Sequence, residues 1–342
     1  MKIICLVQVF NEQMFIKRNL ENVYDLVDQI VITEGNLSPH GNLSETSTDK
    51  TIKEILDFKL EKESAIYDVD EKLAEIYQVG NEAVEFQHNG IYSGGKITLM
   101  PAWQGEAKSR EEWEGKNKSM MLSYADPDDG DVVMILDADE FTPKDTLCEI
   151  INYFKYNPEV NCVGLNEWQF AYGFKWCFRG SHNRFFRYKR GSYFGTTNHF
   201  YHIKSHTERI DISRKADSMF DGMLHFSYSR HPQLIRNKVI SFNRESFIRW
   251  FNTVYLVYPF DKEQAYTNNK VIIPYFGTGW AEGQHTRLEE FKGEFPECLS
   301  DLSDICWLDY IRQHVDELRI GKSYSNDEIL RIANKGRGFY TP

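Results

Sequence analysis

The sequence predicts an α/β protein with a mostly parallel sheet flanked by helices, and three observations support this. Over the first 140 residues, short apolar runs alternate with amphipathic helical patterns, as in β-α-β units. The runs Ile3 to Phe10 and Asp131 to Leu136 are continuous enough to be buried strands. Polar segments follow these runs, where α/β sheets place their ligand-binding loops.

The first half is expected to open with the strand at Ile3 to Phe10. A helix begins at Asn11, and a second strand at Ile30 to Thr33 ends at Glu34. The loop Asn36 to Asp49 is too rich in Gly, Ser, Thr and Asn to be core. Residues 51 to 85 are expected to form acidic helices.

Glycine and proline interrupt the next part of the chain. Gln87 to Trp103 is therefore expected to be a loop or an irregular ribbon, and Glu106 to Tyr124 a helix. The second half predicts, in order, a helix entered at Pro143, a strand near Val160 to Leu165, an aromatic-rich region to Phe200, a helix from Pro232 to about Phe251, the Gly-rich loop Phe276 to Gly283 and two short helices.

Composition and charge limit the class of protein. A chain of 342 residues with 41% hydrophobic residues can bury a large core. The net charge of −11 argues against a surface that binds nucleic acid throughout. The basic segment Arg179 to Arg190 remains open to a donor pyrophosphate, an acidic acceptor or solvent.

We expect a cytoplasmic protein without a membrane span. The chain opens directly on its first strand pattern, with no basic region before it and no cleavage pattern after it. No stretch approaches the ~20 apolar residues that a membrane helix needs. The six cysteines show no C-x-x-C pair or zinc-like spacing, which favours reduced thiols.

Three acidic residues follow the strand at Asp131 to Leu136. Asp137, Asp139 and Glu140 lie within four positions, and such a cluster is costly near a core unless a cation neutralises it. Asp oxygens suit Mn²⁺ or Mg²⁺, whose remaining positions can take phosphate oxygens. The alternative is a solvated acidic turn or a helix N-cap.

The segment VVMILDADEF, residues 132 to 141, resembles the D-x-D strand of GT-A glycosyltransferases, and VQVFNE, residues 7 to 12, resembles the first strand of the family 2 enzymes. EGKNK, residues 114 to 118, is similar to their G-K-x-x-A-x-N helix, although the alanine and the final asparagine are absent. The resemblance implies a GT-A fold, a Rossmann-like mixed sheet. It also implies that Val9, Glu12, Glu34, Lys116 and Asp137 bind a nucleotide sugar.

The second half resembles the family 17 transferases, which add β-linked N-acetylglucosamine to mannose. AYGFKW, residues 171 to 176, and GMLHFSY, residues 222 to 228, are similar to blocks of that family, and Lys238 lies in the helix that follows. Leu224 replaces a family tryptophan. The resemblance implies fold and donor class but not the acceptor.

His225 in the second block is expected to join Asp137 and Asp139 as a metal ligand, since imidazole suits Mn²⁺. The alternative is a core histidine bonded to backbone. The domain expected at 1–255 has a nucleotide-binding half, 1–140, and an acceptor half, 141–255. Residues 256–342 form a C-terminal helical extension.

Further residues are candidates for catalysis and phosphate binding. An inverting transferase needs a base, for which Asp221 and Glu167 are candidates, with a surface carboxylate as the alternative for each. Arg184 and Arg187 are candidates for the donor diphosphate. If their segment is a strand, the two face opposite sides, so only one can reach the site.

The function expected is the metal-dependent transfer of a hexosyl or pentosyl group from a nucleotide diphosphate sugar, with a UDP-sugar favoured and inversion expected. The acceptor is open between a glycan, a lipid-linked sugar and a modified DNA base. Two alternatives remain: a phage-type enzyme that glycosylates a modified DNA base, and a non-catalytic carbohydrate-binding protein on the same fold. A Rossmann oxidoreductase is disfavoured, because no G-x-G-x-x-G follows the first strand.

Overall fold

The computed structural model describes residues 1–35, 47, 49–63, 95–103, 110–196, 199–204, 208–242, 245–263, 265 and 288–321. The chain forms two compact units that interleave along the sequence. The first contains residues 1–138, 144–164 and 183–219, and the second contains residues 139–143, 165–182 and 220–342. The predicted division of the chain at residues 140 and 255 stays a prediction.

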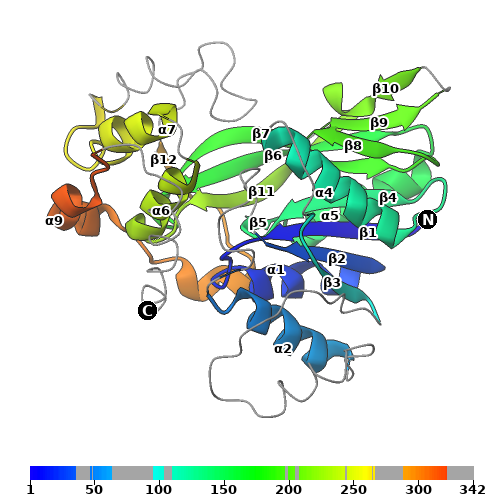
Figure 1. Cartoon of the computed structure of the whole chain (residues 1–342), viewed down its shortest axis with the longest axis horizontal. Coiled ribbons are helices and arrows are strands. Elements are labelled where there is room, and N and C mark those ends of the chain that lie inside the picture. The colour runs from blue at the N-terminus through cyan, green and yellow to red at the C-terminus, as the bar shows by residue number, and fades with distance from the viewer. Residues whose placement is uncertain are drawn as a thin grey trace. The chain divides into compact units, whose positions relative to one another are not determined.

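Nine strands of the described residues form one mixed sheet, in the order β3-β2-β1-β4-β7-β6-β11-β5, with β12 beside β7 (Figure 1). The bounds of its strands are β1 (Ile3–Val9), β2 (Gln29–Glu34), β3 (Ile97–Pro101), β4 (Val132–Asp137), β5 (Glu140–Phe141), β6 (Cys162–Ala171), β7 (Trp176–Arg187), β11 (Ser218–Tyr228) and β12 (Glu289–Glu290).

The first unit holds the parallel part of the sheet. β1 pairs in parallel with both β2 and β4, and β2 pairs in parallel with β3. The order 3-2-1-4 is that of the doubly wound nucleotide-binding sheet, so the predicted α/β, Rossmann-like fold of the GT-A kind is confirmed. The strand order reverses between β1 and β4.

Helices cover both faces of this parallel part. Their bounds are α1 (Ile16–Val23), α2 (Thr51–Glu63), α4 (Arg110–Ala125) and α5 (Lys144–Tyr156). Figure 1 shows α4 on one side of β1 and β2, and α1 with α2 on the other. This arrangement follows from right-handed crossovers, because the chain moves from β1 to β3 in one direction and returns to β4 in the other.

The first unit also contains a three-stranded sheet in the order β10-β9-β8. The strands are β8 (Tyr193–Thr196), β9 (His199–Ile203) and β10 (Arg209–Asp211). β8 joins α4 through Ser119, whose hydroxyl donates to the Phe194 carbonyl at 3.0 Å and accepts from the Phe194 amide at 2.8 Å.

The second unit has an aromatic core. Phe226 stacks on Phe170 and on Phe174, with ring centroids 4.6 Å apart in both pairs. Around this core lie β5, parts of β6, β7 and β11, β12, and three helices: α6 (Pro232–Phe242), α7 (Glu245–Trp250) and α9 (Leu308–Leu318).

Gly173 makes the turn between β6 and β7 possible. Its φ is +112°, and a Cβ at this position would lie 2.0 Å from the Ile305 carbonyl oxygen. Glycine is therefore required for conformation and for space.

Two expectations about single elements were wrong. Residues 97–101 form strand β3, not irregular ribbon, because the run that follows Gly95 pairs in parallel with β2 and ends at Pro101. The first helix starts at Ile16 after a turn in which Asn11 has a φ of +57°. The helix expected from Pro232 to about Phe251 agrees with α6 and α7 over the described residues 232–242 and 245–250.

Some predicted segments lie outside the described residues: 36–46 of the polar loop, 64–94, and 276–283. Among the described helices, none is long and apolar enough to cross a membrane. All six cysteines are free thiols.

Candidate active site

The D-x-D motif, residues 137–139, begins at the last residue of β4. Asp137 is the last residue of β4, and its carboxylate lies 3.6 Å from the Arg184 guanidinium of β7 in the first unit. The side-chain amide of Asn19 in α1 donates to the Asp137 carbonyl at 3.3 Å. Asp139 and Glu140 belong to the second unit, where both are buried.

The pairing of β5 with β11 places His225 beside the motif. His225 is the register partner of Glu140, and the Phe226 amide donates to the Asp139 carbonyl at 2.8 Å. As a result, Nε2 of His225 lies 3.7 Å from Oδ1 of Asp139, and its Nδ1 lies 3.7 Å from Oε1 of Glu140. The structure thus brings together two of the three predicted metal ligands, Asp139 and His225.

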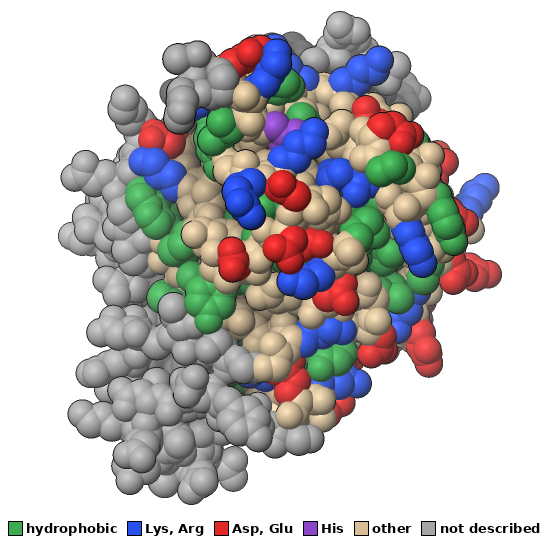
Figure 2. Space-filling model, turned by 90° about the vertical axis from the view of Figure 1, so that its right-hand side faces the viewer, with side chains coloured by type: hydrophobic (Ala, Val, Ile, Leu, Met, Phe, Trp, Pro, Cys, Tyr) green, Lys and Arg blue, Asp and Glu red, His purple; other side chains and the backbone are tan. Residues whose placement is uncertain are grey.

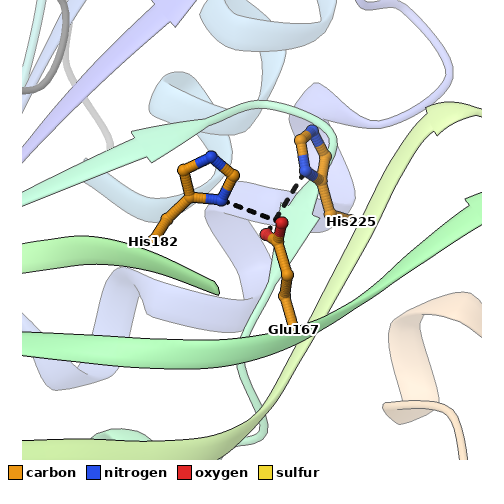
Figure 3. Close-up of side chains that lie close together, drawn as sticks. All are labelled: Glu167, His182 and His225. Atoms are coloured by element: carbon orange, nitrogen blue, oxygen red, sulfur yellow. Dashed lines mark ion pairs between the residues drawn. The ribbon is translucent and has the colours of Figure 1, made fainter. Parts of the chain in front are cut away.

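Glu167 of β6 lies between two histidines (Figure 3). Its Oε1 is 2.8 Å from Nδ1 of His182 on β7, and its Oε2 is 3.4 Å from Nδ1 of His225. The Gln169 side chain also bonds to Glu167. A Cβ at Gly180 would lie 2.5 Å from the Glu167 carboxylate, so the missing side chain at that position makes room for the carboxylate.

Arg230 supplies positive charge on the other side of His225. Its Nη2 donates to Oδ2 of Asp139 at 2.6 Å, and both side chains are buried. This charge-assisted hydrogen bond compensates part of the Asp139 charge.

The ionisation of the cluster follows from these contacts. Burial alone would lower the pKa of His225, but Glu167, Glu140 and Asp139 together raise it to about 9. Burial would raise the pKa of Asp139, yet Arg230, His225 and Lys238 hold it below its usual range. The pKa of Glu167, which burial would also raise, is held well below its usual range by His182 and His225.

The cluster is suited to a cation. Three buried carboxylates surround one imidazole, and a divalent ion that displaces the proton of His225 would take over its role as their positive partner. Two positions for an ion are conceivable, because the two ring nitrogens of His225 face different groups. On the Nδ1 side, Glu167, His182 and His225 offer ligand atoms within 4.8 Å of one another. On the Nε2 side lie Asp139 and the Ser227 hydroxyl, which is 2.6 Å from this nitrogen.

The other predicted donor residues lie in the first unit. The Glu34 carboxylate is buried and accepts a hydrogen bond from the Ser47 amide at 2.5 Å. Val9 is the register partner of Glu34 and is also buried. The Glu12 amide donates to the Thr51 hydroxyl at 2.7 Å, so the described contacts of these residues join β1 and β2 to the chain at 47–51.

Lys116 borders a cavity of about 550 Å³ between α4 and β8. Its ammonium lies 4.9 Å from the ring centroid of Trp103 and 2.9 Å from Glu112. Tyr193 and Phe194 complete the aromatic part of the lining.

Arg184 and Arg187 are both buried in β7, on opposite faces of the strand as the spacing predicts. The Arg187 guanidinium donates to four backbone carbonyls, those of Val160, Phe154, Gly130 and Asn157, at 2.7 to 3.1 Å. This structural role leaves Arg184 as the arginine beside the D-x-D motif.

The burial of both arginines interrupts the basic segment 179–190. On the face drawn in Figure 2, positive and negative side chains are interspersed. No continuous basic surface for nucleic acid is visible on that face.

The two candidate bases lie in different surroundings. Asp221 is exposed and accepts a hydrogen bond from Asn166 at 2.8 Å. It precedes His225 by four residues on β11, about 13 Å along a strand. Glu167 lies beside His225, but a carboxylate with a lowered pKa is a weak base.

Two members of the cluster were not predicted from the sequence. His182 lies in no motif, and the pairing of the consecutive strands β6 and β7 places it beside Glu167. Arg230 directly follows the block around His225, so extending that block by two residues past Tyr228 would have included it.

Two solved structures are similar to this chain at low identity. The crystal structure of S. aureus TarS 1-349 is 12% identical, with a TM-score of 0.34 over 71% of this chain and 64% of that one, so the chain spans less than two thirds of it. The crystal structure of 4-diphosphocytidyl-2C-methyl-D-erythritol synthase is 10% identical, with a TM-score of 0.25 over 66% of this chain and 75% of that one.

No protein-family profile and no curated protein sequence matches the chain. At these TM-scores the two likenesses carry no argument about activity. The fold assignment therefore rests on the strand order and pairing described above.

Proposed function

We propose that the chain is a metal-dependent glycosyltransferase that moves a sugar from a nucleotide diphosphate donor, with a UDP-sugar favoured. The observation that carries the proposal is the convergence of Asp139, Glu140 and Glu167 on His225, immediately after a D-x-D motif that ends a parallel strand. Carboxylate and imidazole ligands suit Mn²⁺, and Mg²⁺ is the second choice.

In this proposal Asp139 and Nε2 of His225 hold the ion, and the D-x-D spacing adds Asp137. The ion would act as a Lewis acid on the diphosphate leaving group. Binding on the Nε2 side requires that this nitrogen carry no proton. Glu167 favours that state, since it lies 3.4 Å from Nδ1 and can accept the proton of that nitrogen.

His182 would act through Glu167. Its ring nitrogen lies 2.8 Å from the carboxylate, and the Gln169 side chain bonds to the same carboxylate. These partners fix the orientation of Glu167, which in turn fixes the orientation of His225. Outer partners of this kind typically contribute about 10- to 100-fold to metal affinity.

Arg230 and Lys238 would stabilise the departing diphosphate, because both place positive charge near Asp139. In the transfer step the bond between the anomeric carbon and the diphosphate oxygen breaks, and its electrons leave with the diphosphate. The acceptor oxygen bonds to the anomeric carbon and gives its proton to a base. With inversion this happens in one step, and Asp221 and Glu167 remain the candidates for the base.

The test is hydrolysis or transfer from a panel of UDP-, GDP- and TDP-sugars with Mn²⁺, with EDTA added in parallel samples. We expect activity with at least one donor, loss of activity on chelation and its return with Mn²⁺. Asp139→Asn and His225→Gln should each lose activity by at least about 100-fold. Glu290→Gln, which changes an exposed carboxylate of the same unit, should retain it.

Activity that survives both chelation and the two substitutions would refute the proposal, as would the absence of activity with every donor. If His182→Ala loses Mn²⁺ while Asp139→Asn retains it, the ion lies on the Nδ1 side of His225. The ligand set would then be Glu167, His182 and His225.

A further inference from the structure

We propose that Gln8 reads the base of the bound nucleotide, by donating a hydrogen bond from its side-chain amide to a base carbonyl oxygen. This inference rests on the proposed function and adds a recognition residue to it. The ligand class it specifies is a nucleotide whose base carries a carbonyl, which includes uracil, cytosine and guanine but not adenine.

The register of the parallel strands defines where Gln8 lies. In β1 it is the partner of Thr33 on β2 and of Asp137 on β4. Register partners in a sheet point to the same face. The Gln8 side chain therefore shares its face with Asp137, whereas Val9 points to the opposite face.

This face changes from apolar to polar at its carboxyl edge. Along β1 the residues Ile4 and Leu6 belong to the core cluster under α4, as do Val133 and Ile135 along β4. One step further along the two strands, the same face carries Gln8 and Asp137. A polar end to an otherwise apolar face costs free energy unless the polar groups find partners.

The polar neighbours of Gln8 already have hydrogen-bond or ion-pair partners. Asn117 of α4 donates to the Thr33 hydroxyl at 2.8 Å and accepts from the Trp103 amide at 2.9 Å. The Asp137 carboxylate lies 3.6 Å from Arg184.

Gln8 itself differs from these neighbours. It is only 7% exposed, and its Nε2 has no hydrogen-bond partner among the described residues. A buried amide donor without a partner is rare in folded proteins and is explained when a ligand supplies the acceptor.

The position within the fold agrees with a ligand at this point. β1 and β4 are the neighbouring parallel strands between which the strand order reverses. Open α/β sheets bind their ligands outside the carboxyl ends of the strands at such a switch point. Gln8 and Asp137 lie at these carboxyl ends.

A base carbonyl fits the free donor better than a phosphate does. A phosphate would be drawn to Arg184, whose charge is stronger than the dipole of an uncharged amide. An uncharged amide instead suits an uncharged acceptor such as a base carbonyl. Adenine offers only ring nitrogens as acceptors, so an amide donor placed to reach a carbonyl oxygen would bind adenine less tightly.

The experiment is calorimetric titration with UDP, CDP, GDP and ADP in buffer that contains Mn²⁺. The wild-type chain should bind at least one of UDP, CDP and GDP at least about 10-fold more tightly than ADP. Gln8→Met, which keeps the length and removes the donor, should weaken that nucleotide by roughly 5- to 100-fold and leave ADP nearly unchanged. Gln29→Met, at the amino end of β2 in the same sheet, is the matched control and should bind as wild type does.

Circular dichroism and thermal melting establish that Gln8→Met folds. If it does not fold, Gln8→Asn, which withdraws the amide by one methylene, replaces it and should show the same loss. A wild-type chain that binds ADP as tightly as the other nucleotides overturns the inference, and so does a folded variant with unchanged preference. A wild-type chain that binds none of the four nucleotides contradicts the proposed function itself.

Discussion

Nε2 of His225 lies 3.7 Å from Oδ1 of Asp139, although the two residues come from distant parts of the chain. The pairing of β11 with β5 brings them together, since His225 is the register partner of Glu140. A histidine beside the second aspartate of the motif is the arrangement that metal binding on this side requires. The first two predictions concern this histidine.

The affinity for Mn²⁺ should rise steeply with pH, and it should do so up to a higher pH than it would with a histidine of ordinary pKa. The pKa of His225 is raised to about 9 in the metal-free protein, and an ion must displace the proton. Between pH 6.5 and 8 the Mn²⁺ affinity should therefore rise by about tenfold per pH unit. Calorimetry in two buffers of different ionisation enthalpy should detect about one proton released, and His225→Gln should release correspondingly fewer.

Without metal, the same histidine should make stability depend on pH. Its pKa is raised from 6.5 to about 9, so its contribution is complete below pH 6.5 and is lost as the pH rises through 9. In EDTA, the melting temperature of the wild type should fall by a few degrees between these values relative to His225→Gln. Parallel melting curves of the two proteins over this range would contradict the raised pKa.

Arg184 and Arg187 should differ in the effects of substitution. Arg187→Lys leaves several buried carbonyls without a donor, and we expect a loss of about 2–4 kcal/mol in the free energy of unfolding. Arg184→Lys should instead weaken donor binding, with a smaller effect on stability. Urea denaturation and donor titration of both variants measure the two effects. If Arg184→Lys mainly lost stability and Arg187→Lys mainly lost donor binding, the roles of the two arginines would be the reverse of those assigned here.

Glu34→Ala should raise KM for the donor more than it lowers kcat. The Glu34 carboxylate, at the end of β2, accepts a hydrogen bond from the Ser47 amide, and the substitution removes this contact. An interaction made equally in the ground state and the transition state affects binding and not the chemical step. Steady-state kinetics decide the point, and an unchanged KM with a reduced kcat would count against the role in binding.

Apolar and polar patterns within short stretches of the sequence were sufficient to predict the strands whose residues form a continuous apolar run. The buried runs became β1 and β4, and the acidic motif lies at the end of β4 as expected. β3 was missed because it has only five residues, lies shortly after Gly95 and ends on Pro101. Such a short strand is recognised by its neighbour β2, with which it pairs in parallel, and not by its own periodicity.

By itself the sequence determined the β-α-β order, the position of Asp137 and Asp139 after a buried strand, and the block that contains His225. These features depend on residues close together in the chain, whose spacing and turn residues are sufficient. The tertiary structure alone decided that Glu167 and His182 face His225, that Arg230 pairs with Asp139, and that Arg187 serves the backbone. Each of these contacts depends on which strands or loops become neighbours and in which register, and a shift of one residue would turn the side chains to the other face of the sheet.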